Sequence, residues 1–192
     1  MNTEKSKWGR LAFSLPLSAF SLLVAGCNIL PQPEADTTRH FTLTSPVTVA
    51  PVADATTVRP VQVAGHLRSR AMAIRVGENE VIYDEDARWA EALDDAITQL
   101  LRARLSAIGG GKVVTVQVQR CELVRSEGNA VQVAASYAIT PALMAAEGAV
   151  QRGTFTASPR TWTGGDRSEL VGQLRDALNE LAAAIAAAVE NN

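Results

Sequence analysis

The clearest strand pattern of the chain is Val114-Thr115-Val116-Gln117-Val118-Gln119-Arg120-Cys121-Glu122-Leu123 (VTVQVQRCEL). Its valines occupy even-numbered positions as far as Val118, and apolar residues then return at the odd-numbered Cys121 and Leu123. Successive side chains of a strand point to opposite faces of a sheet, so a change of parity needs an extra residue. We therefore expect one long strand with a bulge or bend near Gln119 and Arg120.

Further strands are expected on both sides of this stretch. Ser126-Glu127-Gly128-Asn129 is typical of a hairpin turn, and the apolar residues that follow keep one parity from Val131 to Ile139. A weaker strand is expected at 150–157, with Phe155 as its best core candidate. Upstream, the pattern predicts two or three strands between Val61 and Tyr83, with a turn at Gly77-Glu78-Asn79-Glu80.

Two helices are expected, one before and one after the long strands in the sequence. The first is predicted to start at Asp84 to Asp86, because acidic side chains suit the positive end of a helix dipole. Its apolar positions are spaced by three and four: Trp89, Leu93, Ile97, Leu100, Leu101 and Leu105. The second helix is predicted from about Arg167 to Glu190, after a capping-box-like start at Asp166 and Glu169.

The order of these elements predicts an α+β fold. We expect an antiparallel or mixed sheet of about five to six strands, with two helices packed on one face. The chain has 192 residues, of which 47% are apolar, so one domain plus an appendage is the natural expectation. Its formal net charge is −2, and it has no basic stripe that would indicate a nucleic-acid partner.

The predicted appendage is a signal peptide at residues 1–26. Lys5, Lys7 and Arg10 form a basic start, and an apolar run of 14 residues follows from Leu11 to Val24. A membrane-spanning helix needs about 20 apolar residues, so a permanent transmembrane anchor is the weaker interpretation.

The run ends in Leu23-Val24-Ala25-Gly26-Cys27-Asn28, which resembles the bacterial lipobox. The resemblance implies cleavage before Cys27 and acylation of that cysteine, with palmitate as an expected chain. One acyl chain anchors a protein only reversibly, whereas two or more anchor it stably. Asn28, where an aspartate would favour retention in the inner membrane, implies sorting to the outer membrane.

Residues 27–57 are expected to form a tether, because prolines interrupt them repeatedly. One short edge strand is expected within it, at His40-Phe41-Thr42-Leu43. The folded domain is expected at residues 58–190. If Cys27 carries lipid, Cys121 has no partner for a disulfide within the chain, and a buried thiol is its expected state.

The sequence offers no support for catalysis, a metal or a cofactor. His40 and His66 have no metal-ligating neighbour three or four residues away, and no nucleophile-elbow or phosphate-loop motif occurs. The acidic cluster Asp84 to Asp86 is better explained as a helix start than as a cation site.

The chain resembles the ABC-type transport auxiliary lipoproteins, which are similar to paraquat-inducible protein C. The resemblance rests on the lipobox, on Phe41 and Leu43, and on a strand, turn and helix start that read Ile74-Arg75-Val76-Gly77-Glu78-Asn79 and then Arg88-Trp89-Ala90-Glu91. The chain departs from the family pattern at Gly65 to Ser69, and it has Tyr137 where a tryptophan is common. Through the resemblance, Arg75, Asn79, Arg88 and Trp89 become candidate motif or partner-contact residues.

The resemblance implies a lipoprotein on the periplasmic face of the outer membrane, with no enzymatic activity. It would dock the mammalian-cell-entry-type (MCE-type) substrate-binding protein of an ABC transporter, which bridges the periplasm, and so support phospholipid transport between membranes. A homo-oligomer is compatible with this role. The alternative is an envelope-structural or assembly lipoprotein that binds peptidoglycan or an outer-membrane complex.

The sequence leaves two alternatives for Trp89, burial in the core and contact with a partner. Arg88 has two expected roles within the chain: it could cover the ring of Trp89, or it could pair with Glu85 or Glu91.

Overall fold

The computed structural model describes residues 35–43, 52–142 and 150–191. The chain divides into two compact units, Met1–Asp36 and Thr37–Asn192, and every described element lies in the second. This unit includes a short strand at Arg39–Phe41, in the stretch that the sequence predicts as a tether. The predicted signal peptide, Cys27 and Asn28 lie outside the described residues.

The second unit combines one mixed sheet with two α-helices among the described residues. In chain order the elements are β1 (Arg39–Phe41), β2 (Thr57–Val58), β3 (Gln62–Val63), the 3-10 turn η2 (Gly65–Arg68), β4 (Ala71–Arg75), β5 (Val81–Trp89), α2 (Leu93–Leu105), β6 (Lys112–Val124), the 3-10 turn η3 (Arg125–Glu127), β7 (Ala130–Pro141), β8 (Gln151–Thr156), β9 (Arg160–Thr161) and α3 (Arg167–Glu190).

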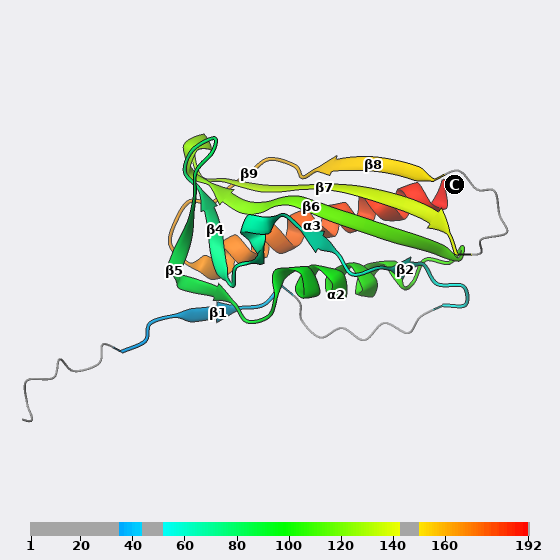
Figure 1. Cartoon of the computed structure of the whole chain (residues 1–192), viewed down its shortest axis with the longest axis horizontal. Helices are drawn as coiled ribbons and strands as arrows, with labels where there is room; N and C mark the ends of the chain where they lie inside the picture. The colour runs from blue at the N-terminus through cyan, green and yellow to red at the C-terminus, as the bar shows by residue number, and fades with distance from the viewer. Residues whose placement is uncertain (1–34, 44–51, 143–149, 192) are drawn as a thin grey trace, which may run out of the picture. The chain divides into compact units, whose positions relative to one another are not determined.

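The main path of the sheet has the strand order β1-β5-β4-β6-β7-β8. β6 and β7 form its longest antiparallel pair, and β8 closes one edge (Figure 1). Along the other side of β6, the strands β2, β3 and β4 pair with it in parallel, one after another. β1 pairs in parallel with the end of β5 at the opposite edge, which confirms the predicted edge strand.

Both helices cover the same face of the sheet and contact each other (Figure 1). The core between the layers holds the helical stripes and the valines of β6, with Val114, Val116, Val118, Ile97, Leu101, Leu178 and Ile185 all at 0% exposure. The predicted α+β fold with two helices on one face is therefore confirmed. The described residues contain no helix that is long and apolar enough to cross a bilayer.

The predicted bulge in β6 is also confirmed. Val118 pairs with Ala135 and Arg120 pairs with Ala134, so Gln119 is the extra residue. Cys121 and Leu123 consequently face the same core as the valines before the bulge, and both are buried. At the other end of the hairpin, Gly128 and Asn129 have φ angles of 67° and 62°, the left-handed conformation that the predicted turn requires.

The predicted start of the first helix is wrong. Asp84, Glu85 and Asp86 lie in β5, which continues to Trp89, and α2 begins only at Leu93. The acidic run imitates a helix start, but Ala87 and Trp89 are buried while Asp86 and Arg88 are exposed, which is the period-2 pattern of a strand. The motif Arg88-Trp89-Ala90-Glu91 thus ends a strand and does not open a helix.

The last helix matches its prediction. α3 spans Arg167–Glu190, and the Asp166 side chain accepts a hydrogen bond from the backbone N–H of Ser168. That bond lowers the pKa of Asp166, with a further contribution from the neighbouring Arg39 guanidinium.

Candidate docking surface

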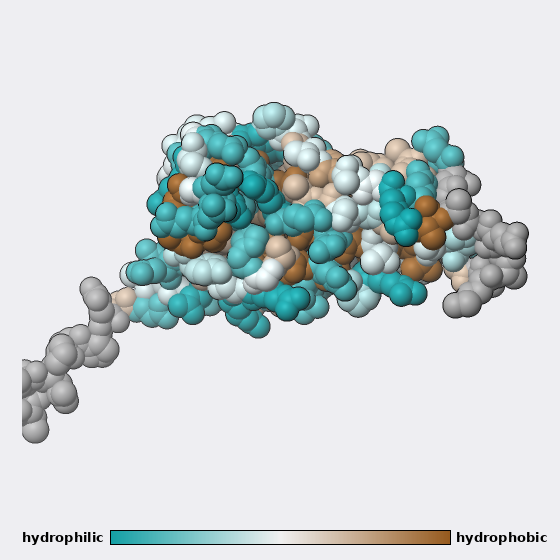
Figure 2. Space-filling model, turned by 45° about the horizontal axis from the view of Figure 1, so that its top comes forward, coloured by the Kyte–Doolittle hydropathy of each residue, from teal (hydrophilic) through white to brown (hydrophobic). Residues whose placement is uncertain are grey.

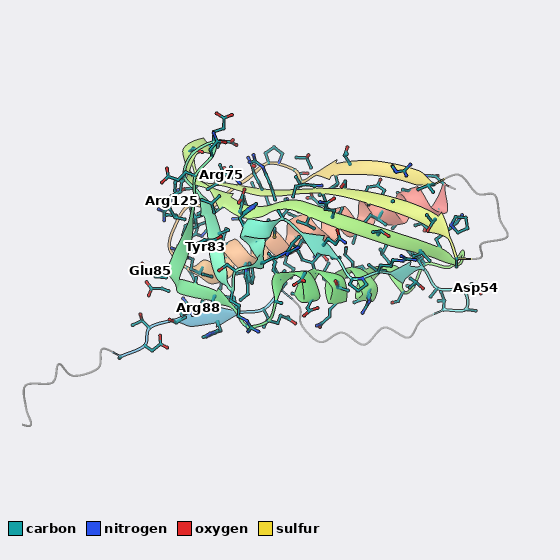
Figure 3. The ribbon with its side chains drawn as sticks, in the orientation of Figure 1. Asp54, Arg75, Tyr83, Glu85, Arg88 and Arg125 are labelled. Carbon is teal, nitrogen blue, oxygen red and sulfur yellow. The ribbon has the colours of Figure 1, made fainter. Side chains whose placement is uncertain are left out.

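The hairpin of β4 and β5 exposes a group of large side chains at one end of the sheet. Ile82 is 38% exposed and Tyr83 is 44% exposed, which sets them apart from the buried apolar residues of the domain. Because they are successive residues of a strand, both faces of the hairpin are open at this point. We call Asn79, Ile82, Tyr83, Glu85 and Arg88 the β5 surface; all five are exposed, and Figure 3 labels the last three.

Arg88 and Trp89 point to opposite faces of β5. Arg88 lies beside Ala71 on β4 and His40 on β1, and it is exposed. Trp89 is 3% exposed and belongs to the core. Neither of the roles expected for Arg88 occurs among the described residues: its guanidinium neither covers the ring nor pairs with a carboxylate. Its charge is therefore available to a partner.

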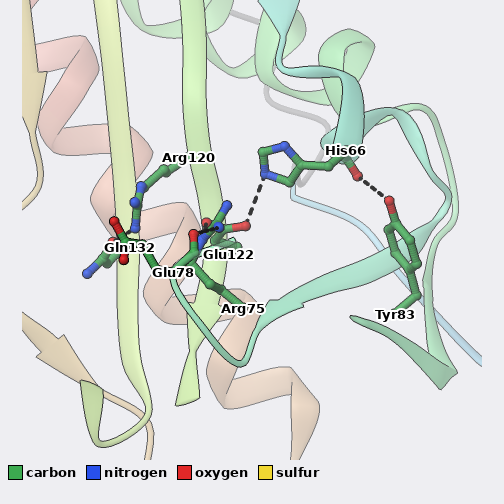
Figure 4. Close-up of polar contacts among 7 residues, drawn as sticks. All are labelled: His66, Arg75, Glu78, Tyr83, Arg120, Glu122 and Gln132. Atoms are coloured by element: carbon green, nitrogen blue, oxygen red, sulfur yellow. Dashed lines mark hydrogen bonds and ion pairs between the residues drawn. The ribbon is translucent and has the colours of Figure 1, made fainter. Parts of the chain in front are cut away.

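A buried ion-pair cluster lies at the base of this hairpin. The side chain of Glu122 on β6 is fully buried, and its Oε1 accepts a hydrogen bond from Arg75 Nε at 2.7 Å (Figure 4). Its Oε2 lies 3.1 Å from His66 Nε2 on η2, and it accepts a hydrogen bond from the ring when that nitrogen carries the ring proton. A buried carboxylate needs such partners, because removal from water without them is costly.

The same cluster holds the β4–β5 turn and β5 itself. Arg75 Nη1 donates to the Glu78 carbonyl in the turn at 3.0 Å. The Tyr83 hydroxyl donates to the His66 carbonyl at 3.1 Å, which ties β5 to η2 (Figure 4). The stretch from Glu78 to Tyr83 is thus fixed to the long strand β6 at both ends. Arg75 holds the Glu78 end, and His66 holds the Tyr83 end.

The middle of β5 is fixed to α3 by a second ion pair. Arg167, the first residue of α3, donates from Nε to Asp84 Oδ2 at 2.7 Å, and its guanidinium stacks 4.6 Å from the centre of the Trp162 ring. Trp162 is buried, so this contact links the hairpin to the core. The β5 surface is consequently a positioned surface, held from both layers of the domain.

The four candidate residues from the sequence thus separate into two kinds. Asn79 and Arg88 are exposed on the β5 surface, whereas Arg75 is occupied by Glu122 and Trp89 is core. They do not converge on one point, because Arg75 lies opposite Val81 and Arg88 lies opposite Ala71, at the two ends of β4.

Sequence reasoning missed Glu122 and His66. The signal for Glu122 was present: it is the one acidic residue in an otherwise apolar strand segment, between Cys121 and Leu123. The signal for His66 was absent, because it lies 56 residues away and only the fold brings it to the carboxylate.

No group of three or more His, Cys, Asp or Glu side chains in the described ranges could hold a metal ion. The one cysteine there, Cys121, is free and buried, and burial raises the pKa of its thiol to about 12, with a smaller contribution from the neighbouring Glu122. This thiol is therefore not a nucleophile at neutral pH.

Comparison with known proteins gives the family. Two crystal structures are similar to this chain. The first is described as an uncharacterized protein; it is 16% identical, its TM-score is 0.61, and the match covers 79% of this chain and 98% of the other. The second is protein XCC0632 from Xanthomonas campestris, of family DUF330; it is 17% identical, its TM-score is 0.63, and the match covers 79% of this chain and 95% of the other. At such identities they support the fold alone. No curated protein matches the chain. The family model for the ABC-type transport auxiliary lipoprotein component matches residues 41–186, most of the chain, and the protein therefore belongs to that family.

Proposed function

We propose that this protein is an outer-membrane-anchored accessory lipoprotein of an ABC transport system, which docks an MCE-type substrate-binding protein that spans the periplasm. In this role it supports the movement of phospholipid between the two membranes and catalyses no reaction itself. The family supports the coarser part, an auxiliary lipoprotein of ABC-type transport. The specific partner and lipid rest on the resemblance of the family to the paraquat-inducible lipoproteins.

The observation that carries the docking proposal is the β5 surface. It exposes one apolar side chain on each face of the hairpin, Ile82 and Tyr83, together with the amide of Asn79 and the cation of Arg88, which has no hydrogen bond or ion pair with a described residue. Aromatic and arginine side chains contribute strongly to protein interfaces, especially where the free surface is already ordered. The ties from Arg75, His66 and Arg167 supply that order before a partner binds.

Docking is tested by capture of the MCE-type protein on the acylated lipoprotein in mild detergent. We expect Tyr83→Ala and Arg88→Glu each to reduce capture at least about tenfold, the loss expected for a central aromatic or a reversed charge. Arg152→Glu is the matched control, because Arg152 is an exposed arginine on β8, at the opposite edge of the sheet.

The two outcomes that contradict docking are specific. If the wild-type protein captures no MCE-type protein while its anchor is intact, the partner is wrong. If it captures peptidoglycan instead, the envelope-structural alternative replaces the transport role.

The membrane location is proposed from Cys27 and Asn28. Cys27→Ala should move the protein from the membrane fraction to the soluble periplasmic fraction, because the acyl chains are its anchor. Asn28→Asp should leave it membrane-bound but shift it to inner-membrane fractions in a sucrose gradient. If wild type and Asn28→Asp sediment together with the inner membrane, the proposed outer-membrane location is wrong.

A further inference from the structure

The face of the sheet that carries no helix is hollowed along β7. The pairing places Thr115, Ala138 and Arg152 in one row across β6, β7 and β8, and Gln117, Ser136 and Thr154 in the next. The central strand contributes the small members, Ala138 and Ser136, and longer side chains stand on both sides. The result is an open trough of about 520 Å³, which we call the sheet trough.

The chemistry of the sheet trough differs from that of the domain as a whole. The chain is net acidic, yet the trough contains one cation, Arg152, and no carboxylate. The guanidinium of Arg152 makes no hydrogen bond or ion pair with any residue of the described ranges. In contrast, Figure 2 shows strongly hydrophilic side chains crowding the end with the β4–β5 hairpin, and paler residues over much of β7 and β8.

The remaining polar groups are uncharged donors and acceptors. Thr115, Ser136 and Thr154 supply hydroxyl groups, and Gln62 and Gln117 supply amides at the margin. The Ser136 hydroxyl accepts a hydrogen bond from Gln119 Nε2 at 2.9 Å, so the bulge residue of β6 orients its free proton. A guanidinium beside several hydroxyl groups suits a phosphate oxygen, which arginine binds through two parallel hydrogen bonds.

The size of the trough restricts the ligand further. A volume of 520 Å³ lies in the range of small-molecule sites, which is about 300–1,000 Å³. It exceeds what inorganic phosphate would fill, but its open form cannot enclose two acyl chains. The neutral hydroxyl and amide groups fit the glycerol hydroxyls of a phosphodiester headgroup.

We propose that the sheet trough binds the anionic phosphodiester headgroup of a phospholipid, with Arg152 on the phosphate and the acyl chains left outside. This inference rests on the proposed role in phospholipid transport and names where that lipid touches this protein. It is independent of the β5 surface, since the trough lies toward the β8 edge and the β5 surface toward the β1 edge.

The test is a titration of the acylated protein with sn-glycero-3-phosphoglycerol, the deacylated headgroup, followed by the phosphorus NMR linewidth in a phosphorus-free maltoside detergent. We expect saturable binding that weakens about tenfold in Arg152→Gln, the fold-change that corresponds to losing one charge-assisted hydrogen bond. Ala138→Leu should weaken it similarly by filling the trough, although Arg152 remains. Arg125→Gln, which removes an exposed arginine in the turn between β6 and β7 and outside the trough lining, should bind as the wild type does.

Four results would overturn the proposal. They are no saturable binding, equal binding of inorganic phosphate, equal binding of the zwitterionic glycerophosphocholine, or equal loss in Arg125→Gln and Arg152→Gln. Unchanged thermal unfolding midpoints establish that the variants are folded. Capture of the MCE-type protein is measured on the same variants, so a failure of the trough with capture retained leaves the docking function standing.

Discussion

At the residue scale, the most consequential side chain is Glu122. It is the one fully buried carboxylate in the described ranges, and it joins a long strand, a 3-10 turn and a hairpin through Arg75 and His66. A buried ion pair adds little net stability over apolar residues, but the loss of one partner leaves the other uncompensated. Its value here is geometric, because it fixes the hairpin that carries the β5 surface.

Replacing Glu122 alone should therefore destabilise the domain much more than replacing Glu122 and Arg75 together. We expect Glu122→Leu to lower the free energy of unfolding by about 3 kcal/mol, and the double variant Glu122→Leu with Arg75→Met to regain most of that loss. Urea denaturation of the two variants measures both values. If the double variant is as unstable as the single one, the loss of stability does not come from leaving Arg75 without its partner, and this explanation is wrong.

Cys121 gives a second prediction at this scale. Since burial raises the pKa of its thiol to about 12, the reactive thiolate is scarce at pH 8 in the folded domain. In a variant without Cys27, a thiol reagent at about pH 8 should modify Cys121 only after urea unfolds the chain. Modification of the native protein at the rate of a free thiol would contradict the buried position.

At the element scale, period-2 patterns predicted the strands well, whereas the acidic run at Asp84 to Asp86 misplaced the start of a helix. The parity change in β6 located Gln119 as a bulge, and the one-parity run in β7 located its core face. The run Asp84 to Asp86 failed as a helix start, because its partners are distant: Arg167 binds Asp84 and Thr37 binds Asp86. Local charge cannot distinguish a helix end from a strand whose acids are paired by the fold.

The bulge can be tested by removing its residue. Deleting Gln119 forces the segment from Arg120 to Val124 to shift against β7 or to turn Cys121 and Leu123 away from the core. We expect the deletion to unfold the domain, whereas Gln119→Ala, which keeps the residue count, should change the unfolding midpoint only slightly. Circular dichroism with urea denaturation distinguishes the two. A deletion variant of near-native stability would mean that the bulge does not set the register.

The N-terminus of α3 offers a pH-dependent test. The folded-state pKa of Asp166 is lowered below its usual 3.8, mainly by the Ser168 N–H, so its stabilising effect is present above that pH and is lost as pH falls through the lowered value. We expect Asp166→Ala to lower the urea midpoint at pH 7, and the difference from wild type to shrink as the pH falls below 3.8 and through the lowered pKa. Asp166→Asn retains the capping side chain without its charge. Its urea midpoint at pH 7 should fall less than that of Asp166→Ala, and the difference from wild type should depend less on pH.

At the scale of the whole molecule, the sequence predicted the layers and the family, but not the site. The strand and helix periods gave an α+β domain with both helices on one face, and the Arg75 to Glu91 stretch pointed to the family that residues 41–186 match. The proposed docking surface could not be predicted in the same way. Whether Arg75 and Arg88 are occupied or available depends on Glu122 and on the face of β5, which long-range pairing decides.

The proposed role depends on the distance between anchor and domain as well as on the domain itself. Residues 28–36 separate Cys27 from the unit that begins at Thr37, and an extended chain spans about 3.3–3.6 Å per residue. Deleting residues 29–34 would shorten the maximal reach by about 20 Å while leaving Cys27, Asn28 and the domain intact. We expect transport in cells to fail, although capture of the MCE-type protein in detergent persists, because detergent removes the need to bridge from a membrane.

The matched control replaces residues 29–34 with six glycine and serine residues. If the segment acts through length alone, this flexible replacement should restore transport, since a Gly/Ser chain of equal length covers a similar range of distances. Restoration would assign the segment the function of a tether. If the replacement does not restore transport although the protein is normally localised to the membrane, Ile29 to Glu34 make a specific contact. The segment would then contribute more than its length.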